Sequence, residues 1–490
     1  MKIYCCMLVI LTLFKVHPVY AQDTLRLHLQ DVVVMAKEKS IAAKKAGTLK
    51  ETRYWEWMTY KSNYQPQLSL KGTLPGYTKS FIQVVQPNGT VDFQPVHNNN
   101  SELELSFSQQ IAQTGGTILG STSLQRFDDF DRNTTIYNGA PYGIGYVQPL
   151  FQFNTLKWDR KIEPLKYNES QQAYIESMEE IAMTASDYFF DLLLAQVDLQ
   201  IATTNLINTQ SIMKIATTKF EMGKITKNEI LQLQLEELKV QKAVGVARRD
   251  MEVSAYNLKA YTGLQSKDKI LLLLPESTIG MNVIAEKALR EAFQNRSDAI
   301  AFGRRLEEAK RDVAKAKGDN GLNASLNSRL GFSKSGTRIG QVYQSPKDQQ
   351  LLELTLEIPI LDWGRQKARK KTALANQQFT QYSVEQDKQN FTQKIITEVN
   401  LFDMMKGQLV LTARAEQIAA EKYQIAKERY VLGNLSITDL SIAFQENDQA
   451  KRDNINSLRD FWGAYYQLRY LSLYDFEKDR KITYNQISNE

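Results

Sequence analysis

Two very long stretches of this chain contain no proline, and this absence constrains the fold more than any other feature. They cover residues 165–274 and 360–490. A proline inside a helix costs ~3 kcal/mol, and both stretches are rich in residues that favour helices, such as Ala, Gln, Glu, Lys and Leu. The sequence therefore predicts helices far longer than those of an ordinary globular domain.

A glycine interrupts each long helical stretch and is followed by a signal for a new helix. At identical spacings the glycine is followed by a hydroxyl residue and then an acid: Gly223, Thr226 and Glu229, and Gly433, Ser436 and Asp439. Glycine commonly ends a helix, and Ser or Thr three residues before an acid commonly begins one. Each stretch is therefore predicted to be a helical hairpin, with tips near residues 223 and 433.

The two hairpins belong to two copies of one unit, because adding 210 to the residue numbers of the first copy aligns it with the second without gaps. Matching positions include Pro149 with Pro359, Gly223 with Gly433, and Tyr256 with Tyr466. An internal duplication must be recognised before any fold is assigned. We therefore predict a first repeat over residues 22–280, a second repeat over 281–475, and a C-terminal tail over 476–490.

Each repeat begins with an amphipathic helix, predicted over residues 27–63 and 283–317. Alternating polar and apolar residues then predict two strands in each repeat. These strands cover residues 67–71, 142–151, 326–332 and 351–361. The pattern of each repeat is thus helix, strand, strand and long helical hairpin.

The first repeat also contains an insertion, residues 79–140, that the second repeat lacks. Two alternating stretches, 102–111 and 117–124, flank Thr114-Gly115-Gly116 and predict a tight hairpin. The flanking segments 87–100 and 128–140 are polar and predict long loops. The sequence leaves open whether this hairpin joins the other strands or folds outside them.

The N-terminus has the pattern of a secretion signal over residues 1–21. A short apolar stretch, 3–14, is followed by Val19 and Ala21 at the positions that precede a cleavage site. Both cysteines, Cys5 and Cys6, lie within this signal, so we expect a mature chain with no disulfide and no lipid anchor. No later apolar run reaches the ~18 residues of a transmembrane helix. The secreted chain is therefore expected to be soluble, exported, or inserted through strands.

Charge and reactive residues argue against nucleic-acid binding, metal binding and catalysis. The 61 basic and 55 acidic residues leave a formal charge of +6, with no dense basic block. After the signal the only histidines are His28 and His97, and neither has a neighbouring ligand set. No nucleophile or phosphate-binding motif is present. We interpret the acidic pairs Glu179-Glu180 and Glu236-Glu237 as solvated helix faces.

The duplicated unit and the hairpin tips resemble the TolC-like outer membrane efflux proteins over nearly the whole mature chain, apart from the insertion. The most specific feature is the tip, where the family places an aromatic residue, two residues, Gly, five residues and an acid. This pattern occurs twice, as Phe220, Gly223 and Glu229 and as Tyr430, Gly433 and Asp439. The same motif at the same place in two repeats is a far stronger signal than either motif alone.

The resemblance implies a mainly helical fold with a membrane β-barrel portion. In this fold three protomers form a channel, in which long antiparallel helical hairpins build an α-barrel. Four strands from each protomer close one shared β-barrel. The implied function is a passive gated exit duct of a tripartite efflux or type I secretion system, which exports small toxic compounds or proteins. The implied partners are a periplasmic adaptor (membrane fusion) protein, an inner-membrane pump and outer membrane lipid, with no cofactor and no enzymatic activity.

The resemblance also implies a gate at the inner mouth of the channel. Tyr430 matches a tyrosine that bonds an acid on the other hairpin, Glu229 matches that acid, and Asp439 matches an acidic ring. Leu435 and Ile442 replace an arginine and a second acid of the family, so the expected closing network is thinner. The alternatives remain that both acids only cap their helices and that Tyr430 only packs. The expected adaptor contacts are the tip residues Gly223, Lys224, Thr226, Gly433, Asn434 and Ser436.

Two further alternatives remain open at this point. The chain could be a secreted periplasmic coiled-coil scaffold without pore activity, whose strands serve only as small caps. An aromatic cluster around the strand that ends near residue 151 could be an interfacial girdle or ordinary packing. This cluster comprises Tyr142, Tyr146, Phe151, Phe153 and Trp158. No feature of the sequence identifies the exported substrate, the pump or the adaptor.

Overall fold

The computed structural model describes residues 24–265, 269–275 and 281–484, so the predicted signal peptide lies outside the described residues. The chain divides into two compact units. Of the described residues, the first unit comprises 24–48, 174–265, 269–275, 281–295 and 394–484, and the second comprises 49–173 and 296–393. The two longest helices contribute residues to both units. None of the described helices combines the length and the apolar character that a membrane span requires.

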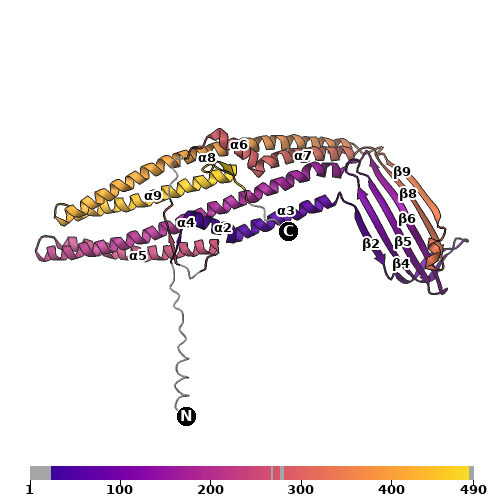
Figure 1. The fold of residues 1–490 in the computed structure, drawn as a ribbon, viewed down its shortest axis with the longest axis horizontal. Coiled ribbons are helices and arrows are strands. Elements are labelled where there is room, and N and C mark those ends of the chain that lie inside the picture. The colour runs from indigo at the N-terminus through magenta and orange to yellow at the C-terminus, as the bar shows by residue number, and fades with distance from the viewer. Residues whose placement is uncertain (1–23, 266–268, 276–280, 485–490) are drawn as a thin grey trace, which may run out of the picture. The chain divides into compact units, whose positions relative to one another are not determined.

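Corresponding helices of the two repeats have identical lengths (Figure 1). The pairs are α2 (Leu29–Lys39) with α6 (Ala285–Asn295), α3 (Ile41–Ser62) with α7 (Ser297–Gly318), α4 (Thr155–Glu221) with α8 (Arg365–Val431), and α5 (Lys227–Thr262) with α9 (Ile437–Ser472). These pairs are 11, 22, 67 and 36 residues long. The long proline-poor stretches thus form α4–α5 and α8–α9, which confirms the two predicted helical hairpins.

The opening helix of each repeat is broken at the same point, so the prediction of continuous helices over 27–63 and 283–317 was wrong there. The breaks fall at Ser40 and Arg296, whose backbones are extended. Ser40 acts as the cap of the following helix, because its hydroxyl accepts a hydrogen bond from the Ala43 amide at 2.9 Å. Such local side-chain bonds compete with the helical hydrogen bonds and favour a new helix start.

The strands of the second unit form one antiparallel sheet in the order β2-β4-β5-β6-β8-β9 (Figure 1). Their bounds are β2 (Gln67–Thr73), β4 (Val91–Gln110), β5 (Thr117–Asp129), β6 (Thr134–Leu150), β8 (Asn323–Gly336) and β9 (Lys347–Glu357). A further strand, β3 (Tyr77–Val85), pairs only with the first half of β4. A short 3₁₀ helix, Ile339–Tyr343, lies between β8 and β9. The inserted hairpin β4–β5 therefore lies inside the sheet, between the two strands that the sequence predicted for the first repeat.

The polar segments that flank this hairpin are not loops, and that prediction was wrong. Residues 91–100 belong to β4, and residues 134–140 belong to β6. Their polarity does not prevent strand formation, because a strand needs paired backbone groups rather than apolar side chains. Asn99, for example, donates a side-chain hydrogen bond to Asp128 across the β4–β5 pair at 2.9 Å. The connecting turns are correspondingly short.

The sheet has one apolar face and one polar face. Residues paired directly across antiparallel strands share a face, so the register identifies both sets. The apolar face consists of Leu68, Leu70, Leu103, Leu105, Phe107, Ile118, Tyr142, Ile144, Leu330, Phe332, Leu352, Leu354 and Leu356, all exposed in the single chain. The polar face consists of Ser69, Lys71, Glu102, Glu104, Ser106, Ser108, Ser121, Ser123, Gln125, Asn327, Arg329, Glu353, Thr355 and Glu357.

Helices of the second unit are joined by ion pairs and an aromatic contact. Arg304 of α7 binds Glu169 of α4 at 2.5 Å, and Arg305 binds Asp387 of α8 at 2.6 Å. The rings of Phe302 and Phe391 meet edge to face at 6.1 Å. The Arg304–Glu169 pair connects the two repeats, and the other two contacts join α7 to α8 within the second repeat.

The core of the first unit is built mainly from large side chains of the long helices. The fully buried ones include Phe189, Phe190 and Leu192 of α4, Phe402 of α8 and Phe461 of α9. Two small sheets accompany this core. One is the parallel pair β1 (Thr24–Leu27) and β7 (Lys269–Leu272), and the other pairs β10 (Tyr474–Asp475) with β11 (Arg480–Lys481).

Candidate functional site at the hairpin tips

The tip of each helical hairpin is closed by a glycine in the left-handed backbone conformation. Gly223 has φ +71° and Gly433 has φ +84°. In the first tip the Gly223 amide donates to the Phe220 carbonyl at 2.8 Å, and the Lys224 amide donates to the Lys219 carbonyl at 2.8 Å. The second tip repeats both bonds. This pair of bonds satisfies the carbonyls that a helix end leaves free, so the predicted C-cap role of both glycines is confirmed.

The helix that follows each tip is capped as predicted. Thr226 accepts a hydrogen bond from the Glu229 amide at 3.3 Å, and the Glu229 carboxylate accepts one from the Thr226 amide at 2.6 Å. Ser436 accepts one from the Asp439 amide at 3.1 Å. The backbone and hydroxyl bonds from Thr226 lower the pKa of Glu229. Glu229 therefore carries negative charge at the first turn of its helix, where the helix dipole stabilises it. Asp439 occupies the same position in the second tip.

Tyr430 is a buried packing residue of the second tip. Its side chain belongs to a cluster with Ala426, Leu440 and Ala443, against which Leu435 packs. The ammonium of Lys219, on the first hairpin, lies 5.2 Å from the centre of the Tyr430 ring. Burial raises the pKa of Tyr430, and the nearby charge of Glu229 raises it further. The contact with Lys219 connects the two tips.

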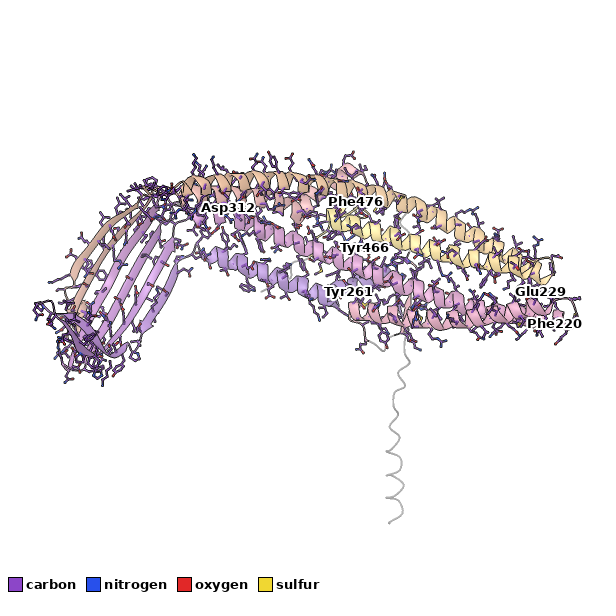
Figure 2. The ribbon with its side chains drawn as sticks, turned by 180° about the vertical axis from the view of Figure 1, so that it is seen from behind. Phe220, Glu229, Tyr261, Asp312, Tyr466 and Phe476 are labelled. Carbon is purple, nitrogen blue, oxygen red and sulfur yellow. The ribbon has the colours of Figure 1, made fainter. Side chains whose placement is uncertain are left out.

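The expected bond between Tyr430 and Glu229 is not formed in the described part of the chain, although the two groups are close enough to interact electrostatically. The Glu229 carboxylate is instead occupied by Thr226. Phe220 and Glu229 both lie at the end of the first hairpin (Figure 2). The first tip thus holds its acid bonded to its own cap residue, Thr226, rather than to the second tip.

The two hairpins share a common apolar contact behind their tips. A second cluster, formed by Ala216, Ile230 and Leu233, lies on the first hairpin. Ile212 and Ile437 pack against both this cluster and the one that contains Tyr430. The tips are therefore held side by side by apolar packing within one chain.

A cavity of about 330 Å³ lies next to this contact, between the two hairpins. Its lining combines apolar and polar side chains, among them Leu233, Glu236, Tyr423, Ile442 and Phe444. Asn208 of α4 donates a hydrogen bond to the Tyr423 hydroxyl of α8 at 3.2 Å beside it. Ile442, which replaces an acid of the family pattern, is exposed and makes this part of the lining apolar.

A series of polar pairs joins α4 to α9 farther from the tips, and sequence reasoning missed it. Asp191 pairs with Arg459 at 2.8 Å, Asp198 pairs with Arg452 at 2.6 Å, and Asn205 donates to Asp448 at 2.7 Å. The α4 members are spaced seven residues apart, which places them on one helix face. That spacing was the available signal, because Arg452 and Arg459 are also seven residues apart.

The acidic residue Glu179 is buried, so its interpretation as part of a solvated face was wrong. Its side chain is 0% exposed and forms ion pairs with Lys37 at 2.8 Å and with Arg469 at 2.7 Å. The Tyr484 hydroxyl also contacts its carboxylate. Burial alone would raise the pKa of Glu179, but Lys37 and Arg469 outweigh it and lower the pKa to about 2. Glu180, its neighbour in sequence, is exposed as predicted.

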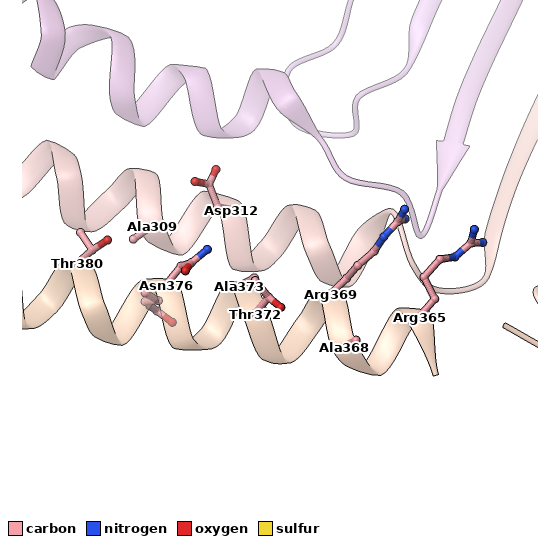
Figure 3. Close-up of a pocket in the computed structure, with 10 residues that line it drawn as sticks. Ala309, Asp312, Arg365, Ala368, Arg369, Thr372, Ala373, Asn376 and Thr380 are labelled. Carbon is pink, nitrogen blue, oxygen red and sulfur yellow. The ribbon is translucent and has the colours of Figure 1, made fainter. Parts of the chain in front are cut away.

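A second cavity, of about 400 Å³, lies between α7 and α8 of the second unit (Figure 3). Small side chains such as Ala309, Ala368 and Thr372 line it. At its edge Arg369 donates a hydrogen bond to Asn320 at 3.1 Å.

Within the described ranges, no three His, Cys, Asp or Glu side chains gather in a way that could hold a metal ion. The aromatic residues around the end of β6 are partly exposed: Tyr142 is 57% and Phe151 is 70% exposed.

Comparison with known proteins agrees with this architecture. The family model described as "Outer membrane efflux protein" matches residues 110–264 and 288–471, which is more than half of the chain. None of the curated proteins matches the sequence.

Several solved structures are similar in fold at low sequence identity. The outer membrane protein VceC of Vibrio cholerae has a TM-score of 0.63 at 14% identity, covering 91% of this chain and 95% of its own. The CmeC outer membrane channel of Campylobacter jejuni has a TM-score of 0.65 at 15% identity, and the match covers 93% of this chain and 87% of CmeC. The open-state MtrE outer membrane channel of Neisseria gonorrhoeae has a TM-score of 0.61 at 13% identity, and the match covers 93% of this chain and 91% of MtrE.

These similarities confirm the predicted fold, with its long helical hairpins and antiparallel strands. The family match extends over both repeats and both tips. The chain therefore belongs to the outer membrane efflux protein family of TolC-like channels, and it is a non-enzymatic outer membrane efflux channel.

Proposed function

We propose that three copies of this chain assemble into a passive, gated exit duct, in which their sheets close one shared β-barrel in the outer membrane. Channels of this family are trimeric. The observation that carries the proposal is the apolar face of the sheet. It presents exposed Leu, Ile and Phe side chains on β2, β4, β5, β6, β8 and β9, opposite a polar face. This alternation suits a wall with lipid outside and water inside.

The edges of the sheet support the trimer. Along the sheet, β2 is paired only with β4 and β9 only with β8, so each has one unpaired side among the described residues. Unpaired strand edges are not tolerated in lipid. Pairing of β9 in one copy with β2 in the next copy would satisfy both edges and close the barrel. A soluble coiled-coil scaffold would leave the apolar face exposed to water.

The proposed gate lies at the hairpin tips, which would form the inner mouth of the duct. Glu229 and Asp439 would line this mouth as rings of negative charge, and Tyr430 would fix the second tip. The buried position of Tyr430 and its contact with Lys219 support its role in holding the tips together. The repeated tip geometry supports two equivalent elements in each copy.

The proposed partners are a periplasmic adaptor protein and, through it, an inner-membrane pump. The adaptor would contact the tip residues Gly223, Lys224, Thr226, Gly433, Asn434 and Ser436. A Cβ added to either glycine would meet no atom within 4 Å, so both tips leave open space for a partner. We further propose cleavage of the signal peptide near Ala21, no lipid anchor, and export of small toxic compounds or proteins.

The experiment that tests the trimer is disulfide cross-linking between the proposed edges. Ser69→Cys on β2 is combined in turn with Glu353→Cys, Thr355→Cys and Glu357→Cys on β9, all on the polar face. We expect at least one pair to give covalent dimers and trimers in the outer membrane fraction. Each single variant, and Leu70→Cys with Thr355→Cys on opposite faces, serves as the control that remains monomeric. Failure of every pair, with a monomeric mass in mild detergent, would overturn the proposal.

A further inference from the structure

We infer that the barrel contains six strands from each copy rather than four, and so eighteen strands in a trimer. The inserted hairpin β4–β5 supplies the two additional strands. This inference rests on the proposed trimeric duct and deepens it, because it sets the width of the exit. It follows from the pairing, the side-chain pattern and the exposure of the hairpin.

The first step is the pairing, which makes β4 and β5 internal strands of the sheet. The second half of β4 is paired with β2 on one side, from Gln67↔Ser108 to Thr73↔Glu102. On its other side β4 pairs with β5 from Asn98↔Asp129 to Gln110↔Thr117. β5 in turn pairs with β6 from Thr117↔Val147 to Asp129↔Thr134, with one irregularity. A hairpin that folded outside the wall would instead leave β2 beside β6.

The second step is the side-chain pattern, which continues through the hairpin in register. Leu105 on β4 lies opposite Leu70 on β2, and Phe107 lies opposite Leu68. Their neighbours Glu104 and Ser106 lie opposite Lys71 and Ser69 on the other face. The inserted strands therefore carry the same apolar and polar faces as the strands they separate. A loop over the mouth of the barrel, or a plug inside it, would have no need of an apolar face.

The third step is exposure. Leu103, Leu105 and Phe107 remain 38%, 39% and 38% exposed in the single chain. Exposed apolar residues on consecutive positions of one strand face need a nonpolar environment. Lipid provides that environment only if β4 is part of the barrel wall.

The additional strands widen the exit, because barrel diameter grows roughly linearly with strand number. With a strand spacing of ~4.8 Å and a tilt of ~40°, eighteen strands give a backbone diameter of about 36 Å and twelve give about 24 Å. An α-helix with its side chains is ~10–12 Å across. The wider barrel thus leaves room for polypeptide as well as for small molecules.

The test is the distance between equivalent sites in the three copies, measured by pulsed electron paramagnetic resonance. A spin label at Asn327→Cys on β8 uses the polar face of a strand that either barrel would contain. The only cysteines in the chain, Cys5 and Cys6, lie in the predicted signal peptide. For a label near the wall, eighteen strands give a distance of about 30 Å between copies, and twelve give about 20 Å.

A deletion of residues 91–133 provides the matched comparison. It removes β4 and β5 and joins the end of β3 to the start of β6, which runs antiparallel to β2. We expect the distance between labels at residue 327 to shorten from about 30 Å to about 20 Å in this variant. If the shortened protein fails to assemble, the distance in the full-length chain still decides between the two barrels.

A second pair of labels tests directly whether β4 is part of the wall. We expect a label at Leu105→Cys to be accessible to oxygen dissolved in lipid and protected from a water-soluble nickel chelate. A label at Glu104→Cys, the next residue on the same strand, should show the reverse. Equal access of the chelate to both sites would overturn the inference.

The outcomes separate this inference from the proposed function. A trimer with the longer of the two label distances and opposite accessibilities at residues 104 and 105 supports the eighteen-stranded barrel. A trimer with the shorter distance in the full-length chain overturns the inference and leaves the trimeric duct intact. A monomeric protein without any distance between copies would overturn both.

Discussion

Glu179 and Arg469 form a buried ion pair that joins the long helix of the first repeat to the last helix of the second. The Arg469 Nε lies 2.7 Å from a Glu179 carboxylate oxygen, and Lys37 of α2 lies 2.8 Å from the other oxygen. Arg469 also pairs with Asp475 at 2.6 Å. One carboxylate therefore holds three helices of the first unit together.

Replacing this carboxylate should destabilise the first unit strongly. Glu179→Gln leaves Lys37 facing a neutral amide at a buried site and leaves Arg469 only its pair with Asp475. Removal of one member of a buried ion pair typically costs about 3–5 kcal/mol. We expect a clearly lower melting temperature by circular dichroism. Glu236→Gln, which removes an exposed ion pair with Lys239, should leave the melting temperature unchanged. Equal melting temperatures for both variants would contradict the assigned role of Glu179.

The lowered pKa of Glu179 predicts that the stability of the folded chain depends on pH. The pKa of Glu179 is about 2 in the folded chain, below the ordinary value of about 4.3 for an unfolded glutamate. Its stabilising contribution is therefore complete above about pH 4.3 and is lost as the pH falls toward 2. We expect the melting temperature of the wild type to fall more steeply between pH 4.5 and pH 2 than that of Glu179→Gln. Parallel curves for the two proteins would show that this carboxylate does not titrate as described.

The tip glycines should tolerate substitution less well than glycines within the helices. Gly433→Ala places a side chain at φ +84°, in the left-handed region, which costs about 1–2 kcal/mol. Gly407→Ala lies within α8, where an added Cβ has open space, and should stabilise the helix by about 0.5–1 kcal/mol. Thermal unfolding of both variants measures this difference. A stabilising effect of Gly433→Ala would rule out the left-handed tip.

The proposed gate predicts that two changes at the tips make the channel leak. Glu229→Gln retains the helix cap, because glutamine also serves at this position, but it removes the charge. Tyr430→Phe keeps the buried ring and removes the hydroxyl. We expect cells with the double variant to become sensitive to a large antibiotic such as vancomycin. Glu236→Gln, on the same helix, is the control and should leave antibiotic sensitivity as in the wild type. A double variant with the antibiotic sensitivity and channel conductance of the wild type would count against the gate.

Much of the helical architecture could be predicted from the sequence because its signals are local. The absence of proline from 165–274 and 360–490 predicted α4–α5 and α8–α9, and glycine followed by a cap predicted the tips. The breaks at Ser40 and Arg296 were missed, because a single polar residue within an amphipathic pattern does not reveal a helix end. The constant offset of 210 between matching residues is the signal that predicts the two repeats from the sequence.

The sheet and the buried charges could not be predicted in the same way. The polar residues of 91–100 resemble a loop, and only their pairing with β3 and β5 shows that they form a strand. Glu179 resembles its neighbour Glu180 in sequence, and only the approach of Lys37 and Arg469 from distant helices distinguishes the two. Both features depend on contacts between segments far apart in the chain, which local patterns do not encode.

The most direct test of the trimeric gated duct is the single-channel conductance of the detergent-extracted protein in a planar bilayer, with Asp439→Ala measured alongside. Asp439 is exposed in the first turn of α9, so the proposed trimer carries a ring of acids at its inner mouth. We predict discrete, long-lived openings that favour cations and are blocked by divalent cations, with the block lost in Asp439→Ala. Absence of any insertion, together with recovery of the protein from the soluble periplasmic fraction, would contradict the account.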